Sequence, residues 1–178
     1  MIKFCPITTS NMQHYKFMEE LLIESFPPEE YRQLDKLREY TDKKNNFVNN
    51  IIFNDELPIG FITYWDLDNF YYIEHFATNK ALRNGGYGKL SIEHFCHLSD
   101  RPIVLEVEKP KNEMAKRRIN FYQRQGFKLW HKEYFQPPYK EEDHNIPMYL
   151  MVYGNLNEKT DYEEIKTQIH NIVYGQNK

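Results

Sequence analysis

Apolar positions along the chain follow two different periods. Runs of alternating or continuous apolar, β-branched and aromatic residues predict seven strands. These runs lie at 2–7, 47–53, 57–65, 69–78, 102–108, 127–135 and 146–153. The polar turn Asn54-Asp55-Glu56 joins the second run to the third and predicts a hairpin there.

Helical spacing of apolar residues predicts five helices. The first covers 12–26 and ends at Pro27-Pro28, and the second covers about 29–40. We expect Gly126 to end the fourth helix in a left-handed conformation. The residues expected on the inner faces of the last three helices are Gly88, Ile92, Phe95 and Ser99, then Ala115, Ile119 and Tyr122, then Tyr162, Ile165, Ile169 and Ile172.

The order of these elements predicts an α/β (α+β) fold, a mixed sheet of about seven strands with helices on both faces. A single domain is expected over 1–154, followed over 155–178 by a tail that forms a C-terminal amphipathic helix. The apolar stripe of this helix is expected to pack on the domain or on a second copy of the chain, which makes a homodimer a candidate assembly.

Composition and charge narrow the class of protein. Hydrophobic residues make up 40% of the 178 positions, which is enough for a core, and the formal net charge of −3 argues against a general nucleic-acid binder. Cys5 and Cys96 are too few and too far apart for a disulfide framework or a thiolate zinc site. No stretch approaches membrane-spanning length. We therefore expect a cytoplasmic protein that has neither nucleic acid nor a membrane as partner.

The sequence RNGGYGK at 83–89 places three glycines between two cations, just before a predicted helix. A helix start exposes unpaired N–H groups and about half a positive charge, so glycines there let an anion approach closely. The spacing fits neither the Walker A motif nor the dinucleotide fingerprint. A phosphate-binding loop and a plain turn both remain open for this run.

Two blocks of sequence resemble the GCN5-related N-acetyltransferase (GNAT) family. The stretch ATNKALRNGGYGKL is similar to the signature Arg/Gln-x-x-Gly-x-Gly/Ala, matched by Arg83, Gly86 and Gly88, and IEHFAT is similar to the strand before it. Downstream, LEVE and RRINFYQRQGF resemble the fifth strand of the family, its next helix and its sixth strand. The resemblance covers about 71–127. It implies a mostly antiparallel sheet and transfer of an acetyl group from acetyl coenzyme A (acetyl-CoA) to an amine.

The resemblance also implies which residues contact the coenzyme. The pyrophosphate would lie on the glycine run, and the backbone of the fourth strand would hold the oxyanion and the pantetheine arm. The residues concerned are Phe76, Ala77, Thr78, Arg83, Asn84, Gly85, Gly86, Tyr87, Gly88 and Lys89. An asparagine common in the family is Ala115 here, and Asn112 is a candidate to take over its contact. No metal is expected, because His94 and His97 lack a third ligand.

Acyl transfer needs a proton for the departing thiolate, and Tyr122 is the candidate acid. A free tyrosine has a pKa of about 10, just above the value of about 8.5 for a thiol, so donation is feasible. The resemblance agrees, because many members carry a tyrosine at this place. The alternative is a core tyrosine on an apolar stripe.

Glu74 and Glu106 are lone carboxylates within otherwise apolar strands, and each is a candidate for the base that accepts the amine proton. Glu74 is the first choice. A structural ion pair with an arginine from a neighbouring helix is the alternative for either residue.

The resemblance implies that the acceptor pocket is lined by the segments 24–32 and 134–147, which combine carboxylates with aromatic rings. We therefore expect a small amine as acceptor, cationic rather than acidic. The candidate contacts are Glu29, Glu30, Tyr31 and Tyr139. The alternative for these charges is a solvated loop. A non-catalytic module that binds coenzyme A or another phosphate ligand is the alternative function.

Overall fold

The computed structural model describes residues 1–82 and 85–176, which form two compact units. The first unit comprises Met1–Asp66 and Ile73–Leu98, and the second comprises Leu67–Tyr72 and Ser99–Lys178. Strand β4, Tyr71–Thr78, contributes residues to both units.

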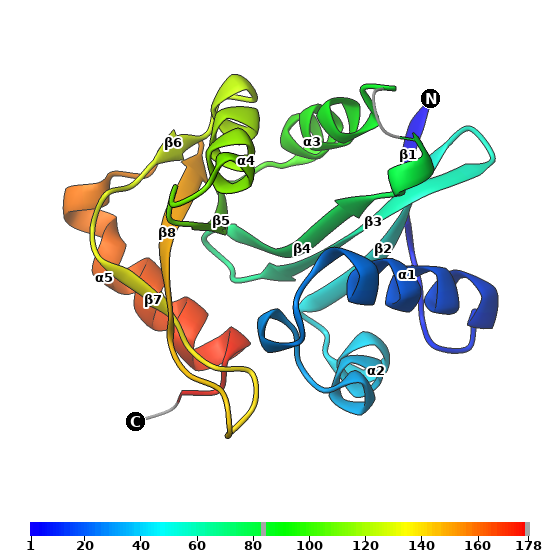
Figure 1. Ribbon diagram of the computed structural model, residues 1–178, viewed down its shortest axis with the longest axis horizontal. Helices are drawn as coiled ribbons and strands as arrows, with labels where there is room; N and C mark the ends of the chain where they lie inside the picture. The colour runs from blue at the N-terminus through cyan, green and yellow to red at the C-terminus, as the bar shows by residue number, and fades with distance from the viewer. Residues whose placement is uncertain (83–84, 177–178) are drawn as a thin grey trace. The chain divides into compact units, whose positions relative to one another are not determined.

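The first unit is built on strands in the order β1-β2-β3-β4. Its elements are β1 (Ile2–Pro6), α1 (Met12–Ser25), the 3₁₀ turn η1 (Pro28–Glu30), α2 (Leu34–Lys43), β2 (Phe47–Asn54), β3 (Leu57–Asp66), β4, the 3₁₀ turn η2 (Lys80–Leu82) and α3 (Tyr87–Leu98). The hairpin between β2 and β3 is confirmed, with Asp55 at φ 54° in its turn. Helices α1 and α2 cover one face of these strands and α3 covers the other (Figure 1).

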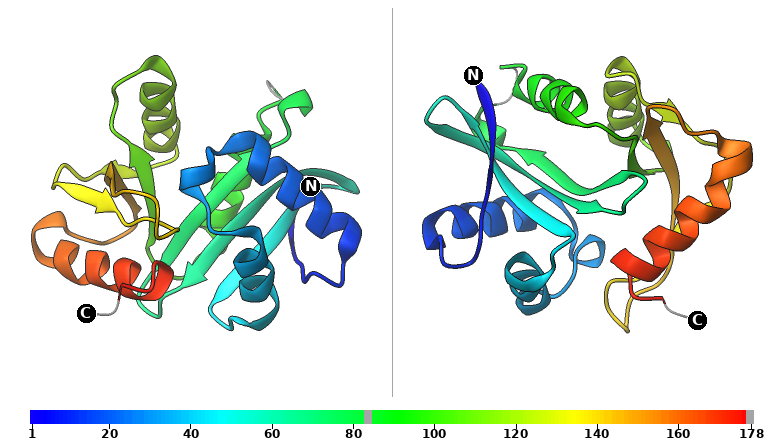
Figure 2. Two further views of the ribbon diagram at one scale, coloured as in Figure 1. Left: turned by 60° about the horizontal axis from the view of Figure 1, so that its bottom comes forward. Right: turned by 180° about the vertical axis from the view of Figure 1, so that it is seen from behind.

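The second unit is organised around β8, which pairs antiparallel with β5, β6 and β7. Its elements are β5 (Ile103–Glu108), α4 (Glu113–Arg124), β6 (Lys128–Leu129), β7 (Tyr134–Gln136), β8 (Ile146–Tyr153), α5 (Glu158–Gln168) and the π-helical turn η3 (Ile169–Val173). Helices α4 and α5 lie on opposite sides of these strands (Figures 1 and 2). Gly126 has φ +90° after α4, as predicted.

The helix predicted over 29–40 is wrong at its start. Residues 28–30 form η1, Tyr31 is extended with φ −144° and ψ 154°, and α2 begins only at Leu34. Between them Arg32 is 5% exposed, because its side chain enters the core of the first unit. Burial of this side chain therefore outweighs the helical propensity of the surrounding residues.

The single strand predicted over 127–135 is divided into β6 and β7. The interruption follows from contacts with the tail, because the Lys132 N–H donates to the Glu158 carboxylate of α5 at 2.6 Å. Trp130 and Tyr162 pack beside this contact, with their ring centroids 6.3 Å apart. The backbone there pairs with a helix instead of continuing along β8.

The apolar stripe of the tail is confirmed except at its last position. Tyr162, Ile165 and Ile169 are buried, whereas Ile172 is 39% exposed and Val173 is buried in its place. The cause is the π-helical turn Ile169–Val173, which shifts the inner face by one residue.

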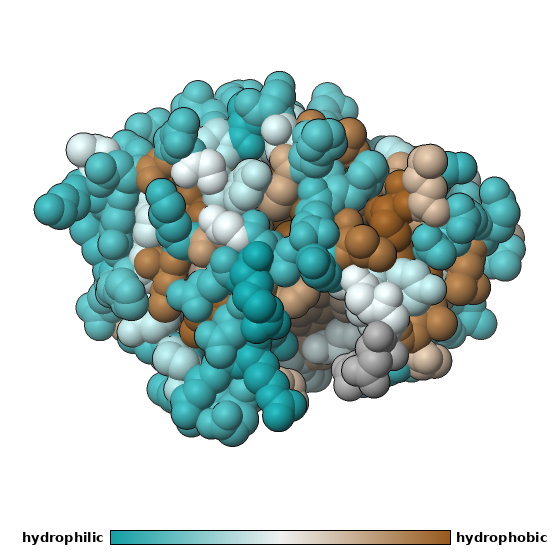
Figure 3. Space-filling view, turned by 90° about the horizontal axis from the view of Figure 1, so that it is seen from above, coloured by the Kyte–Doolittle hydropathy of each residue, from teal (hydrophilic) through white to brown (hydrophobic). Residues whose placement is uncertain are grey.

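These units confirm the α/β class, with mostly antiparallel strands and helices on both sides of them. Hydrophilic residues dominate the face seen in Figure 3, with smaller apolar patches between them. Within residues 1–82 and 85–176, no helix has both the length and the apolar character needed to cross a membrane. The division into a domain over 1–154 and a tail over 155–178 stays a prediction.

Candidate active site

The glycine run leads directly into α3. Gly86 has φ +73°, and a Cβ built on it would meet nothing within 4 Å, so the left-handed backbone, and not a lack of space, favours glycine here. The Leu90 N–H donates to the Gly86 carbonyl at 3.1 Å and closes the first turn. Lys89 is exposed and lies 3.6 Å from Glu93. Arg83 and Asn84 lie outside the described residues.

The inner face of α3 agrees only in part with the prediction. Ile92 and Phe95 are buried, whereas Gly88 is partly exposed and Ser99 follows the end of the helix. The first turn nevertheless presents its amides beside exposed glycine backbone, as an anion site at a helix start requires.

Strand β4 turns alternate backbone groups toward β3. The Asn79 N–H donates to the Ile59 carbonyl at 2.8 Å, and a Cβ on Gly60 would lie 2.3 Å from the Ala77 carbonyl oxygen. Because successive residues of a strand direct their N–H and C=O groups to opposite edges, the groups of Phe76 and Thr78 point away from β3. Contacts of Phe76, Ala77 and Thr78 with the coenzyme stay predictions.

Glu74 forms an ion pair with Arg32 inside the first unit. The side chains of Arg32 and Glu74 are 6% and 0% exposed. The Arg32 guanidinium lies over the ring of Tyr40 at 4.5 Å and within 6 Å of the Phe47 and Trp65 rings. The arrangement corresponds to the ion pair that the sequence left open, with the arginine supplied by a loop instead of a helix.

His75 connects β4 to the turn η1. Its Nε2 donates to the Glu30 carbonyl at 2.8 Å, and the Phe26 ring packs edge-on at 4.8 Å. Burial lowers the pKa of His75, so the ring is neutral at neutral pH and carries its proton on Nε2. This contact fixes the backbone beside Glu29, Glu30 and Tyr31, three of the candidate acceptor contacts.

Tyr122 lies on the buried face of α4 in the second unit. Ala115, Ile119 and Tyr122 are buried on one side of this helix, as predicted. Tyr122 is 8% exposed, and its ring meets Phe121 and Phe127 edge-on at 5.1 and 5.4 Å. This packing is also that of the core tyrosine left open by the sequence, and the role of Tyr122 as the acid stays a prediction.

Asn112 occupies the N-cap of α4, where its side-chain oxygen accepts from the Ala115 N–H at 2.8 Å. This contact gives Asn112 a structural role at the helix start. A contact with the coenzyme stays a prediction.

Glu106 on β5 is held by tyrosine hydroxyls. Tyr134 donates to its Oε1 at 2.5 Å and Tyr174 donates to its Oε2 at 2.9 Å. Burial and the Glu106 charge raise the pKa of both tyrosines well above 10, so both remain protonated donors. The candidate acceptor contact Tyr139 packs on Tyr174, with ring centroids 4.9 Å apart.

Three of the residues that contact Glu74 and Glu106 were not identified from the sequence. Arg32 was assigned to a helix, Tyr134 to the interior of one long strand, and Tyr174 was not considered. They lie 42, 28 and 68 positions from their glutamate partners. The glutamates themselves were visible as lone charges in apolar strands, but nothing local in the sequence indicated which partner each would meet.

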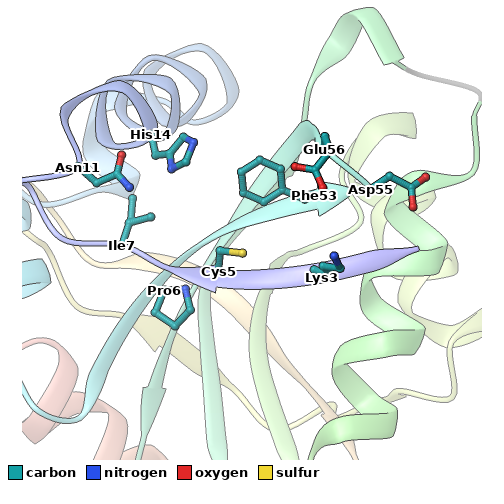
Figure 4. Close-up of a pocket in the computed structure, with 9 residues that line it drawn as sticks. All are labelled: Lys3, Cys5, Pro6, Ile7, Asn11, His14, Phe53, Asp55 and Glu56. Carbon is teal, nitrogen blue, oxygen red and sulfur yellow. The ribbon is translucent and has the colours of Figure 1, made fainter.

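A pocket of about 250 Å³ lies at β1, the start of α1 and the hairpin of β2 and β3, and its lining includes none of the predicted site residues. Figure 4 shows its lining residues, which are Lys3, Cys5, Pro6, Ile7, Asn11, His14, Phe53, Asp55 and Glu56. Among the described residues, no group of three or more His, Cys, Asp or Glu side chains is placed to hold a metal ion.

The model of the acetyltransferase (GNAT) family matches residues 14–127, which include the glycine run, β4, β5 and α4. The chain belongs to this family. A structure from Bacteroides thetaiotaomicron whose name assigns it to the GNAT family is 71% identical, covers 98% of this chain and 99% of its own, and has a TM-score of 0.96. No curated protein matches the chain.

More distant GNAT-like structures show the fold alone. NAA60 from Arabidopsis thaliana in complex with acetyl-CoA is 18% identical over 86% of this chain and 98% of its own, with a TM-score of 0.58. A chimera of the spermidine N-acetyltransferase SpeG from Vibrio cholerae with hSSAT is 12% identical over 85% of this chain and 94% of its own, with a TM-score of 0.59. The family assigns the chain to the acetyl-CoA-dependent N-acetyltransferases.

Proposed function

We propose that this GNAT protein transfers the acetyl group of acetyl-CoA to the primary amine of a small, cationic acceptor by direct attack. Tyr122 acts as the acid and Glu106 as the base. The observation that carries this assignment is the difference between the two candidate carboxylates. Glu74 is bound by a buried arginine, whereas two tyrosine hydroxyls hold the two carboxylate oxygens of Glu106 in a fixed orientation.

The proposed reaction has two proton transfers. The amine nitrogen attacks the thioester carbonyl and forms the new C–N bond, and Glu106 accepts the proton that the nitrogen releases. The C–S bond then breaks, and the departing thiolate takes the proton of the Tyr122 hydroxyl. The backbone N–H groups of Phe76 and Thr78 are the proposed donors to the oxyanion between these steps. Solvent returns the proton to Tyr122 and removes the one on Glu106.

The coenzyme is proposed to place its pyrophosphate at the glycine run and the start of α3. Support comes from the left-handed Gly86, from its unobstructed backbone and from the cation Lys89 in the first turn. Arg83, Asn84 and Asn112 are retained as proposed contacts on the resemblance alone.

The preference for a cationic acceptor rests on charge and aromatic surface. The exposed Glu29, the partly buried Glu30 and Tyr31 lie together at η1, and Tyr139 stacks beside the Glu106 cluster. Carboxylates and tyrosine rings both attract an ammonium group. Acetylation restricted to acidic amines in a mixed panel would contradict this choice.

Substitution of Tyr122 by Phe tests catalysis against the alternative of a module that binds coenzyme A without turnover. We expect Tyr122→Phe to lower the rate of thiol release from acetyl-CoA by about 10²–10⁴-fold while coenzyme binding is retained. The matched control is Tyr153→Phe, because the Tyr153 ring also packs on Phe127, with ring centroids 5.5 Å apart. Release of no thiol by the wild-type protein with any amine would favour the module.

A further inference from the structure

The C-terminal segment reaches the proposed base. Tyr174 follows α5 and η3 and donates to the Glu106 Oε2, while Tyr134 on β7 donates to the other carboxylate oxygen. The Tyr174 hydroxyl also lies 3.2 Å from the Tyr72 hydroxyl and 3.4 Å from the Tyr139 hydroxyl. All five residues belong to the second unit. Four tyrosine hydroxyls and one carboxylate thus form a single network, which we call the Glu106 network.

Tyr174 is the central residue of the Glu106 network. A tyrosine hydroxyl has one proton to donate and two lone pairs to accept with. A carboxylate is the strongest acceptor among the three neighbours, so the Tyr174 proton is directed to Glu106. A lone pair remains for the Tyr72 hydroxyl, and the Tyr139 hydroxyl lies 3.4 Å away. Tyr174 therefore connects the proposed base to Tyr139, a proposed contact of the acceptor.

The backbone before Tyr174 is irregular in a way that produces this contact. The turn Ile169–Val173 is π-helical, which turns Ile172 outward and Val173 inward. A π-helical turn inside a helix is rare and frequently lies at a functional site. A ring contact with β7 holds the segment in place, because His170 packs on Tyr134 at 5.4 Å, and the Tyr174 ring lies 6.5 Å from His170.

The register of β5 and β7 on β8 places Tyr134 on the same face of the sheet as Glu106. Glu106 is opposite Leu150, and Tyr134 is opposite Met148, on the two edges of β8. Since positions 148 and 150 point to one face of β8, Glu106 and Tyr134 project from that same face. The tail helix covers it, as the contact of Tyr174 shows. The Glu106 carboxylate is therefore held by Tyr134 of β7 and by Tyr174 of the tail.

We infer that Tyr174 is a positioning residue for acetyl transfer, which holds the Glu106 carboxylate toward the acceptor amine, so that the C-terminal segment is part of the site and not an appendage. This inference rests on the proposed function. It concerns orientation, so removal of the Tyr174 hydroxyl is expected to act on kcat and not on the affinity for acetyl-CoA.

The test uses the full chain and substitutions that remove single hydroxyls. Tyr174→Phe is compared with Tyr162→Phe, whose hydroxyl lies on the same C-terminal segment but donates to the Glu133 carbonyl at 2.5 Å. Both variants are assayed with acetyl-CoA and with an amine that the wild-type protein acetylates. We expect Tyr174→Phe to lower kcat by about 10- to 100-fold, as for the loss of a hydrogen bond to a charged group, with the KM for acetyl-CoA unchanged.

The double variant Tyr174→Phe/Glu106→Gln separates positioning from a general loss of folding. If Tyr174 acts through Glu106, the double variant is no slower than Glu106→Gln alone, because the two effects are not additive. Equal circular dichroism spectra and melting temperatures for Tyr174→Phe and Tyr162→Phe complete the comparison.

Each remaining outcome has a definite meaning. An active wild-type protein in which Tyr174→Phe matches Tyr162→Phe in kcat, or in which the Tyr174 and Glu106 effects add, overturns the inference and leaves the proposed function standing. A wild-type protein that releases no thiol with any amine overturns both.

Discussion

Glu74 and Glu106 occupy similar sequence patterns in different strands and meet opposite surroundings. Glu74 in the first unit pairs with Arg32, which is itself enclosed by aromatic rings. Glu106 in the second unit is held by the hydroxyls of Tyr134 and Tyr174. An arginine pairs with the first carboxylate, and two tyrosine hydroxyls orient the second.

A lone carboxylate in an apolar strand therefore predicts that the side chain has polar partners. It does not predict whether the carboxylate has a structural or a catalytic role. A buried ion pair is retained only as a pair, since losing one partner leaves an uncompensated charge. A carboxylate whose two oxygens accept from tyrosine hydroxyls is held in one orientation, which suits it to accept a proton from a substrate. Glu74 was the first choice as base in the sequence, and its contacts favour a structural role.

The largest expected effect is on stability and comes from Glu74→Gln. This change removes the Glu74 charge that faces the buried Arg32 guanidinium, and we expect a loss of about 3–5 kcal/mol in the free energy of unfolding. Urea denaturation followed by circular dichroism measures it.

The matched control replaces both partners of that pair. In Arg32→Met/Glu74→Leu no charge remains, so we expect most of the lost stability to return. A double variant as unstable as Glu74→Gln would show that the pair itself does not carry the effect.

The sequence was sufficient to predict the fold class, the position of the glycine run before a helix, and the elements β4, β5 and α4. It failed where a distant partner decides the local structure. The helix predicted over 29–40 starts late because Arg32 reaches Glu74, and the strand predicted over 127–135 divides because Lys132 binds Glu158 of the tail. The exposure of Ile172 depends on a π-helical turn, which regular 3.6-residue spacing does not predict.

The same limit applies to the candidate site. Tyr122 is on the buried face that its spacing predicted, since a helical face is a local property. The partners of Glu106 are not local, because Tyr134 arrives through the pairing of β7 with β8 and Tyr174 through the tail.

A smaller effect on stability is expected from the titration of His75, the neighbour of Glu74. Burial lowers its pKa, so below a pH of about 6.5 the unfolded chain takes up a proton that the folded chain resists. Stability is therefore full above this pH and decreases as the pH falls, by up to about 1.4 kcal/mol per pH unit. The carboxylates with lowered pKa, such as Asp42 and Asp55, add their loss only at lower pH.

His75→Gln checks this assignment, because glutamine keeps a donor for the Glu30 carbonyl but does not titrate. We expect a flatter dependence of the unfolding free energy on pH between about 6.5 and 5 than in the wild-type protein. Identical slopes for the two proteins would show that another group causes the loss.

The contrast between the two carboxylates is tested most directly by the rate of acetyl transfer per folded molecule in Glu106→Gln and in Glu74→Gln. Thiol release from acetyl-CoA with a cationic amine is measured at a temperature at which circular dichroism shows both variants folded. We predict a loss of about 10²-fold or more for Glu106→Gln and a rate near that of the wild-type protein for Glu74→Gln. A slow Glu74→Gln beside a fully active Glu106→Gln would contradict the account.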